Sequence, residues 1–324
     1  MLPALILAAG TGTRLDPLTR VLAKPVVPLA GRTLIERVLE WLRTQGVTDA
    51  VINLHHRPET ITGVVGDGSA VGVRIQYSWE PEILGSAGGP RHALPLLGER
   101  FLIVNGDTLV NFALAPMIAD HRTRGADVTV AVIPNPRPHH YHGMRLDADD
   151  RVTGFVLKGS SEPSWHFVGV QVTESRVFAT LEDNVAAETV TGLYRQLVAS
   201  RPGALRGFRA QTTFLDVGTS RDYLDAALRL AAPEPNAIEA GAWIDPRARV
   251  TSSVVWRDAA IADGATLEGC IVVSGVRVPS GLSARDAILL PQALARPADL
   301  VDRIGTIAVA SVDGGHSERS GESC

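Results

Sequence analysis

The stretch that decides the fold lies at the start of the chain and reads Leu5-Ile6-Leu7-Ala8-Ala9-Gly10-Thr11-Gly12-Thr13-Arg14-Leu15, with Lys24-Pro25 a little further on. An apolar run ends in two closely spaced glycines, and the cations Arg14 and Lys24 follow. Glycine lets the main chain approach an anion with its N–H groups turned inward. Arginine binds phosphate oxygens through paired N–H groups, and lysine adds a mobile positive charge. This order predicts a buried strand followed by a phosphate-binding loop.

The glycine pattern differs from two common nucleotide-binding motifs. A P-loop needs Gly-Lys-Ser or Gly-Lys-Thr after four spacer residues, and no such triplet follows Gly10 or Gly12. A dinucleotide fingerprint needs a third glycine where Leu15 stands. It also needs an acidic residue at the end of the second strand, where Val51-Ile52-Asn53-Leu54 has none. The loop therefore belongs to neither class.

The composition limits the classes of protein to which the chain can belong. Its 324 residues suffice for two domains, and the net charge of −4 gives no basic footprint for nucleic acid. The two cysteines, Cys270 and Cys324, lie far apart, which suits a reducing compartment. The first residues read as a strand rather than a signal peptide, and no apolar run reaches the roughly 18 residues of a membrane span. We therefore expect a cytoplasmic protein that binds small molecules and neither nucleic acid nor membrane.

Strand and helix patterns alternate through the first half of the chain. The expected strands are residues 5–9, 49–54, 73–77, 101–104 and 128–133, and the expected helices are 33–44, 58–65, 86–97 and 114–124. Thr33 and Glu36 form a candidate capping box at the start of the first helix. Such alternation predicts an α/β fold with a doubly wound, mixed but mainly parallel sheet. Ligands bind such sheets at the carboxyl ends of the strands.

The pattern changes in the second half. Short strands are expected at residues 144–147, 152–157 and 167–172, helices at 185–199 and 220–230, and a linker at 233–236. Beyond the linker, apolar residues recur every six positions with a single one-residue slip, at Ile244, Val250, Trp256, Ile261, Leu267 and Val273. This period predicts a short β-helix over residues 237–300, after a first domain at residues 1–232. Residues 311–324 are rich in Gly, Ser and Glu and are expected to be disordered.

Two aspartates stand where a strand is expected to end or a helix to begin. Asp107 follows the apolar segment at residues 101–104, and Gly106 before it permits close approach of a ligand. Asp216 precedes the helix expected from Ser220. Either aspartate alone also suits a turn or a helix cap. Asp107 is expected on the same rim of the sheet as the glycine loop, because both follow the carboxyl ends of strands.

Residues 5–28 resemble the signature of the sugar-1-phosphate nucleotidyltransferases, Leu-Ala-Ala-Gly-x-Gly-Thr-Arg-Leu-x-Pro-Leu-Thr followed by Pro-Lys-Pro, although Ala23 replaces the first proline of the second motif. The resemblance implies a Rossmann-like nucleotidyltransferase domain. It also implies attack by a sugar-1-phosphate oxygen on the α-phosphorus of a nucleoside triphosphate, with release of pyrophosphate. The repeat resembles the left-handed hexapeptide β-helix that some members carry, notably proteins similar to mannose-1-phosphate guanylyltransferase.

The resemblance also implies roles for individual residues. Arg14 and Lys24 cannot offset the charge of a triphosphate and a sugar phosphate, so Mg²⁺ is expected as cofactor. Asp107 and Asp216 match its carboxylate ligands in the family. The implied catalytic residues are Arg14, Lys24 and Asp107. The implied nucleotide contacts are Leu7, Ala8, Ala9, Gly10, Gly12, Thr13, Arg14, Gly85, Ser86, Gly88 and Asp107.

The segment Leu84-Gly85-Ser86-Ala87-Gly88 resembles the Leu-Gly-Thr-Ala-Gly segment that lies against the base in guanylyltransferases. Backbone groups around Gly85 and Gly88 are expected to read the edge of the base, with no side chain in the way. Ser86 also suits the N-cap of the following helix. The family's uridylyl and thymidylyl branch usually carries glutamines here, and residues 80–89 contain none. Their absence favours a purine.

The sugar contacts match the family only in part. Gly143 belongs to a segment that resembles the family's Tyr-Gly step, and Lys158 matches the lysine of its Glu-Lys-Pro motif. Gly169 stands where the family has an Asn-Ala-Gly-like motif. We expect Gly143, Lys158 and Gly169 to contact the sugar phosphate. The polar residues that commonly read sugar hydroxyls are missing, which leaves the identity of the sugar open.

Three functions remain open from the sequence. The first is transfer of a guanylyl group from GTP to mannose 1-phosphate. The second is a uridylyltransferase that acts on glucose 1-phosphate or an amino-sugar 1-phosphate. The third is a non-catalytic regulatory subunit that binds an NDP-sugar, although such subunits tend to lose residues that are present here, Arg14, Lys24, Asp107 and Asp216. The β-helix offers a surface for a homo-oligomer.

Overall fold

The computed structural model describes residues 1–297 and 300–313, which divide into two compact units. The first unit comprises residues 1–10 and 37–215, and the second comprises residues 11–36 together with the chain from Asp216 onward. This division does not follow the boundary expected near residue 232, because residues 11–36 pack with the C-terminal part of the chain. The glycine loop therefore passes from one unit to the other between Gly10 and Thr11.

The first unit is built on a mixed sheet with the strand order β10-β6-β9-β4-β1-β2-β3. These strands are β1 (Ala4–Leu7), β2 (Asp49–Leu54), β3 (Arg74–Trp79), β4 (Arg100–Asn105), β6 (Val128–Pro134), β9 (Trp165–Glu174) and β10 (Leu205–Arg209). Strand β1 pairs in parallel with β2 and β4, whereas β9 runs antiparallel to β4 and β6. The expected mainly parallel sheet is confirmed, and the carboxyl ends of β1, β2, β3 and β4 share one edge.

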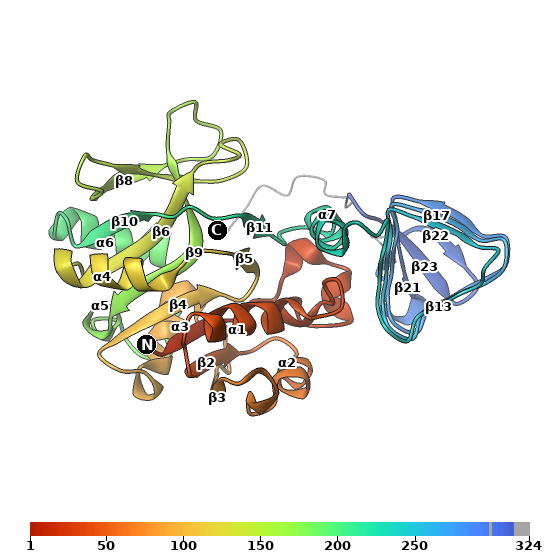
Figure 1. The fold of residues 1–324 in the computed structure, drawn as a ribbon, viewed down its shortest axis with the longest axis horizontal. Coiled ribbons are helices and arrows are strands. Elements are labelled where there is room, and N and C mark those ends of the chain that lie inside the picture. The colour runs from red at the N-terminus through yellow and green to blue at the C-terminus, as the bar shows by residue number, and fades with distance from the viewer. Residues whose placement is uncertain (298–299, 314–324) are drawn as a thin grey trace. The chain divides into compact units, whose positions relative to one another are not determined.

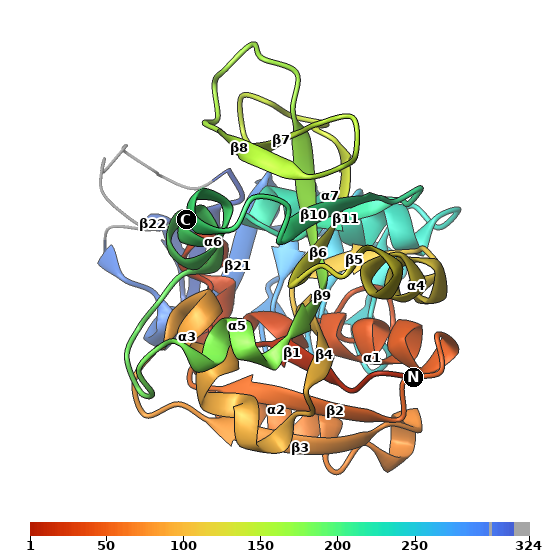
Figure 2. The same cartoon turned by 90° about the vertical axis from the view of Figure 1, so that its left-hand side faces the viewer.

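Helices cover both faces of this sheet, as Figure 2 shows, with α3, α5 and α6 on one side and α1 and α4 on the other. The helices are α1 (Leu34–Thr44), α2 (Pro58–Val65), α3 (Gly85–Ala93), α4 (Leu114–Arg124), α5 (Ser175–Ala179) and α6 (Tyr194–Ser200). The capping box is present, since Thr33 N donates to Glu36 Oε2 at 2.7 Å and Glu36 N to Thr33 Oγ1 at 3.4 Å. Within the described ranges, no helix combines the length and the apolar character that a bilayer crossing requires.

Two parts of the first unit differ from the sequence expectation. Strand β10 was not expected, because Gly207 interrupts its apolar pattern; a Cβ there would lie 2.7 Å from Leu146 Cδ1, so the glycine admits that side chain. The helix expected at residues 185–199 begins only at Thr189, as a π-helical turn (Thr189–Leu193) that continues into α6. The short strands expected at residues 144–147 and 152–157 are present as β7 (Gly143–Leu146) and β8 (Val152–Val156), which pair antiparallel. The short strands β5 (Thr108–Val110) and β11 (Phe214–Asp216) also pair with each other.

The second unit contains the parallel β-helix, whose coils Figure 1 shows stacked in register. Ala237 pairs with Val254, Val254 with Ile271 and Ile271 with Ile288, so each coil takes 17 residues. The one-residue slip in the repeat is thus the shortened third side of the coil. The strands are β12 (Ala237–Ile238), β13 (Trp243–Ile244), β14 (Arg249–Thr251), β15 (Val254–Val255), β16 (Ala260–Ile261), β17 (Thr266–Glu268), β18 (Ile271–Val272), β19 (Arg277–Val278), β20 (Ser283–Arg285) and β21 (Ala287–Pro291).

An antiparallel hairpin closes the β-helix and extends beyond the end expected at residue 300. It consists of β22 (Leu300–Ile304) and β23 (Ile307–Ser311), and β23 also pairs with β21. Residues 311–313 therefore do not begin a disordered tail. Val312 N donates to Asp286 O at 3.0 Å, and Asp313 forms an ion pair with Arg221 at 2.8 Å. Residues 314–324 lie outside the described part of the chain.

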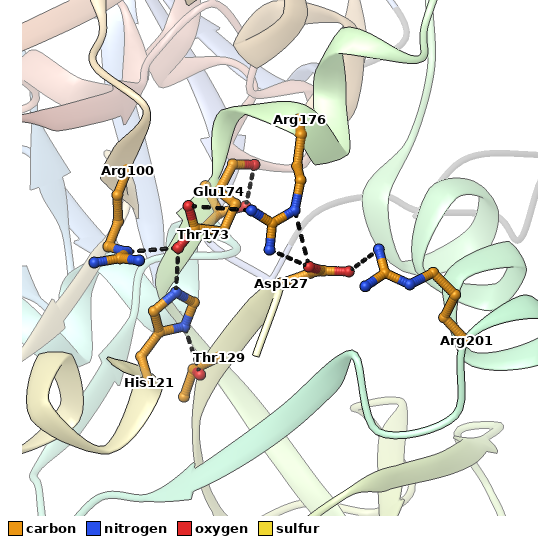
Figure 3. Close-up of polar contacts among 8 residues, drawn as sticks. All are labelled: Arg100, His121, Asp127, Thr129, Thr173, Glu174, Arg176 and Arg201. Carbon is orange, nitrogen blue, oxygen red and sulfur yellow. Dashed lines mark hydrogen bonds and ion pairs between the residues drawn. The ribbon is translucent and has the colours of Figure 1, made fainter. Parts of the chain in front are cut away.

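A buried charged cluster occupies the opposite edge of the first unit's sheet, where β4 and β6 begin (Figure 3). Glu174 accepts from Arg100 and lies 3.1 Å from His121 Nε2, and the other ring nitrogen of His121 lies 2.8 Å from Thr129 Oγ1. Burial lowers the pKa of His121, and the positive charges of Arg100 and Arg176 lower it further against the opposing effect of Glu174. Burial raises the pKa of Glu174, but hydrogen bonds from Arg100 and His121 outweigh it and hold that pKa below its ordinary value.

Acidification is expected to destabilise the protein through His121. The pKa of His121 in the folded state lies below the value of about 6.5 in an unfolded chain. The unfolded state therefore binds more protons below about pH 6.5, and the free energy of unfolding falls as the pH falls. Urea unfolding at several pH values between 7.5 and 5.5 measures this slope, which His121→Gln should reduce and the exposed-site control His139→Gln should not. An unchanged slope in His121→Gln would contradict the assignment.

Candidate functional site

The first part of the glycine loop belongs to the first unit and follows β1. Ala8 N donates to Asn53 Oδ1 at 2.6 Å, and Leu7 O accepts from Gly106 N at 2.9 Å. A Cβ on Gly106 would lie 2.7 Å from Leu7 O, so only glycine allows this approach. Asp107 is the next residue, and its Oδ1 accepts from Thr108 Oγ1 at 3.2 Å. Asp107 thus follows the carboxyl end of β4 beside the start of the loop, as the sequence predicts.

The second part of the loop belongs to the second unit and consists of short 3-10 turns. Gly12 adopts a φ of +62°, and a Cβ on it would lie 2.9 Å from Thr19 Cγ2 and 3.1 Å from Lys24 Cβ. Lys24 is only 8% exposed, so its charge is held in a largely buried place, whereas Arg14 is exposed. The close packing at Gly12 fixes the stem of Lys24 against the loop.

Arg14 and Asp216 approach each other within the second unit. A Cβ built on Gly218 would lie 3.2 Å from Asp216 Oδ2 and 3.6 Å from Arg14 Nη1, so both side chains face the same point. Asp216 ends β11, and Gly218 precedes helix α7 (Ser220–Ala231). Thr219 and Asp222 form a capping box at the start of that helix. The family-like acidic motif is therefore placed beside the cation of the glycine loop.

The β-helix is connected to residues 11–36 through hydrogen bonds to a tyrosine of α7. Trp256 Nε1 donates to Tyr223 OH at 2.7 Å, and Tyr223 OH donates to Pro28 O. Tyr223 and Trp256 are both fully buried. Arg20 Nη1, within the same segment, donates at 3.0 Å to Leu294 O in the turn that follows β21. The C-terminal coils therefore support residues 11–36 directly.

Removing the hydroxyl that links these parts is expected to destabilise the second unit. Tyr223→Phe leaves the buried Trp256 indole N–H and the Pro28 carbonyl without their partner, which costs about 1–3 kcal/mol. Thermal and urea unfolding of the variant measure the loss. The matched control is Tyr77→Phe, whose hydroxyl donates to Gly66 O at an exposed position and whose loss should cost little. Equal stability of both variants would contradict a bracing role for Tyr223.

The segment expected to read the base, residues 84–88, packs against residues 185–189. Ala187 O accepts from Ala87 N at 2.8 Å and from Gly88 N at 3.2 Å. A Cβ would lie 2.6 Å from Glu188 Oε1 at Gly85 and 2.6 Å from Val185 O at Gly88. These glycines are thus required by packing inside the protein, and the Gly88 N–H is used internally rather than left open for a base.

Ser86 is not the N-cap of α3. The cap position is Leu84, which makes no capping side-chain bond, while Ser86 Oγ bonds the Glu188 carboxylate and accepts from Thr189 N at 2.9 Å. Glu188 is a residue that sequence reasoning missed, because nothing in its local pattern indicates a partner 102 positions away. Its carboxylate holds Ser86, and with it residues 84–88, in place.

The structure places the three expected sugar-phosphate contacts in two locations. Gly143 and Lys158 belong to the β7–β8 region, where Lys158 N donates to His142 Nδ1 at 3.2 Å. Burial lowers the pKa of His142, and the charges of Lys158 and Arg195 lower it further. Gly169 lies apart on β9, where a Cβ would lie 2.9 Å from Asn105 Cβ. Gly169 is therefore beside the strand end that carries Asp107.

An aromatic group lies next to Gly143. His166 stacks on Tyr141 with the ring centres 4.2 Å apart, and the rings of His166 and Phe214 meet edge to face with their centres 4.9 Å apart. Burial lowers the pKa of His166 to about 4. This imidazole is therefore neutral at pH 7. The guanidinium of Arg137 lies over the other side of this group, 4.7 Å from the centre of the Tyr141 ring, and donates to the Tyr141 hydroxyl.

No group of three or more His, Cys, Asp or Glu side chains in residues 1–297 and 300–313 is arranged to hold a metal by itself. Magnesium is usually held by one or two carboxylates, with waters and substrate phosphates completing its coordination. Asp107 and Asp216 each offer a carboxylate after a strand, which fits that donor chemistry.

The doubly wound sheet, the glycine loop with its cations and the aspartates after strands define a nucleotidyltransferase fold followed by a β-helix. The family described as Nucleotidyl transferase matches residues 3–232, and the chain belongs to this family. Mannose-1-phosphate guanylyltransferase of Mycobacterium tuberculosis is 29% identical over 86% of this chain and 81% of its own. N-acetylmuramate alpha-1-phosphate uridylyltransferase of Neisseria meningitidis is 37% identical over 67% of this chain and 93% of its own.

A solved structure supports the fold. The crystal structure of HddC from Yersinia pseudotuberculosis aligns with a TM-score of 0.63 and 22% identity, over 71% of this chain and all of the other (100%). The resemblance to sugar-1-phosphate nucleotidyltransferases is thus confirmed at the level of family and fold. The relatives differ in the nucleotide and the sugar that their names specify.

Proposed function

We propose that the chain transfers the guanylyl group of GTP to mannose 1-phosphate with Mg²⁺ as cofactor, giving GDP-mannose and pyrophosphate. The observation that carries nucleotidyl transfer is the loop itself, in which Gly12 packs on the stem of a buried Lys24. The choice of substrates is supported by the similarity to the Mycobacterium tuberculosis guanylyltransferase, which extends over 292 residues and so beyond the family domain. The lack of glutamine in residues 80–89 also favours a purine.

The reaction needs no general base, because the attacking phosphate oxygen is already an anion. It requires that the two substrates be positioned and that their negative charge be neutralised. Arg14 binds phosphate oxygens as an exposed guanidinium, and Lys24 adds a charge with a fixed stem. Asp107 and Asp216 would be the magnesium ligands, and bound magnesium would neutralise charge on the triphosphate. Holding two anionic reactants in line supplies roughly 7–11 kcal/mol of the barrier reduction.

A uridylyltransferase is the second candidate. The Neisseria meningitidis uridylyltransferase is more similar in sequence, at 37% identity, although its match covers only 67% of this chain. The segments Leu157-Lys158-Gly159 and Phe167-Val168-Gly169 also support it, because they lack the polar residues that commonly read sugar hydroxyls in the family. In this reading the acceptor is glucose 1-phosphate or an amino-sugar 1-phosphate.

The test is a matrix of four nucleoside triphosphates against several sugar 1-phosphates, scored by pyrophosphate release with Mg²⁺. The acceptors are mannose, glucose, N-acetylglucosamine and N-acetylmuramate 1-phosphates. The highest kcat/KM for GTP with mannose 1-phosphate is the expected result. Preference for UTP would favour the second candidate. Absence of turnover with every pair, together with NDP-sugar binding, would instead identify a regulatory subunit.

A further inference from the structure

A chain of buried polar side chains joins the glycine loop to the segment at residues 84–88. Asn53 is 3% exposed and Glu80 is fully buried, and neither was singled out by a motif. Asn53 Oδ1 accepts from Ala8 N at 2.6 Å, and Asn53 Nδ2 donates to Glu80 Oε1 at 2.7 Å. Glu80 Oε2 accepts from Leu84 N at 3.0 Å. The two loops are therefore connected through two side chains.

The parallel sheet creates this connection. Asn53 belongs to the second-last residue pair between β2 and β3, in which it lies opposite Ser78, and Glu80 follows directly after β3. Glu80 N continues the ladder by donating to Leu54 O at 2.9 Å. Both side chains thus emerge at the carboxyl edge of the sheet, beside the end of β1. Their backbones are fixed by strand pairing, so the two side chains are held in place relative to the neighbouring loops.

Helix α3 closes over the pair and leaves no free space. A Cβ on Gly89 would lie 2.6 Å from Glu80 Oε1 and 2.8 Å from Asn53 Nδ2. The helix therefore packs directly on the amide–carboxylate contact at a position where only glycine fits. Water has no room to replace a lost partner, so each hydrogen bond of the chain must be made by protein atoms. A buried donor or acceptor left without a partner is costly.

The order of donors and acceptors is fixed at both ends. Ala8 N–H and Leu84 N–H are backbone donors, so the atoms facing them must accept. A carboxylate has two acceptor oxygens, and an amide has one acceptor and one donor group. With an amide at position 53 and a carboxylate at position 80, every contact pairs a donor with an acceptor. The reverse arrangement, a carboxylate at 53 and an amide at 80, also satisfies every contact.

We propose that Asn53 and Glu80 are positioning residues that set the spacing between the phosphate-binding loop and the base-binding segment. This inference rests on the proposed function, since it assumes that one nucleotide binds to both parts. A nucleotide gains affinity from both loops only when their separation matches its length, because a rigid site avoids the cost of ordering loops on binding. Neither side chain needs to touch the nucleotide.

Exchanging the two side-chain chemistries tests the proposal. Glu80→Gln places an amide N–H against a donor, and Asn53→Asp places two carboxylates face to face. Each single variant is expected to weaken binding of GTP or UTP by about tenfold, measured calorimetrically with Mg²⁺, and to raise KM more than it lowers kcat. Binding of pyrophosphate alone, which needs no link to the base segment, should change by less than about twofold. The double variant Asn53→Asp with Glu80→Gln restores every donor–acceptor pair and should bind the nucleotide within about threefold of wild type.

The control separates positioning from general destabilisation. Tyr194→Phe removes another buried bond of the first unit, from Tyr194 OH to Gln171 Oε1 at 2.7 Å, in which neither loop takes part. It should lower the melting temperature without weakening nucleotide binding. A double variant that is as stable as wild type but binds nucleotide about tenfold more weakly than wild type would overturn the proposal. This criterion holds whether or not the single variants fold.

The two proposals fail in different ways. Normal recovery of nucleotide binding in the double variant, with no turnover of any substrate pair by the wild type, would remove the proposed function but retain the positioning role. Turnover by the wild type with single variants that bind nucleotide normally would remove the positioning role alone. A wild-type protein that binds no nucleotide would overturn both.

Discussion

Asp107→Ala is expected to lower Mg²⁺-dependent turnover by at least about 10³ while leaving the fold intact, because it removes a proposed carboxylate ligand of the metal. The side chain lies after β4, and the strand's own pairing to β1 and β9 does not depend on it. Initial rates of pyrophosphate release over a magnesium titration measure the effect, and thermal unfolding checks the fold. Asp107→Asn, which keeps the shape of the side chain, should be nearly as inactive.

The matched control for the loss of a carboxylate is Asp120→Ala. Asp120 lies on α4, where it forms an ion pair with Arg124 at 2.6 Å. Removing Asp120 changes the net charge by the same amount as removing Asp107. It should leave turnover within about twofold of wild type, since an isolated surface ion pair contributes little to the stability of the fold. Wild-type rates in Asp107→Ala, or the same loss in both variants, would show that Asp107 is not the metal ligand.

Lys24→Ala is expected to reduce turnover by roughly 10²–10³, the usual effect of removing one preorganised charge-stabilising group. Lys24 is 8% exposed, so its charge acts where water screens it only weakly. Steady-state kinetics with saturating magnesium measure the change, which should appear mainly in kcat. We attribute the loss of turnover to the missing charge and to the loss of the position in which packing against Gly12 holds the lysine side chain.

Lys24→Met separates the charge from the packing. Methionine keeps an unbranched stem where Lys24 Cβ and Cδ would lie 3.1 Å and 3.5 Å from a Cβ on Gly12, so it preserves the contact but not the cation. We expect Lys24→Met to be as slow as Lys24→Ala but more stable. A methionine variant with wild-type rates would mean that the lysine serves only to pack the loop.

The regular elements were largely predictable from local pattern. Strand β2 and helices α2 and α4 have the expected bounds, and a glycine ends each of the two helices, Gly66 after α2 and Gly125 after α4. The six-residue period of the C-terminal region likewise indicated stacked coils, and the slip in it proved to be the shortened side of a 17-residue coil. Strand β10 could not be predicted in this way, because the glycine at its centre interrupts the apolar pattern. That glycine, Gly207, is needed where the side chain of Leu146 packs on the strand.

Taken alone, the amino-acid order determined the α/β class, the β-helix and the presence of a glycine loop with cations, since each depends on spacing between near neighbours. Only the folded chain decided how that loop is supported. The contacts from Asn53 to Ala8 and Glu80 span 45 and 27 positions, and the contact from Ser86 to Glu188 spans 102. Such pairs leave no periodic trace, because they arise when parallel strands bring distant residues to one edge of the sheet.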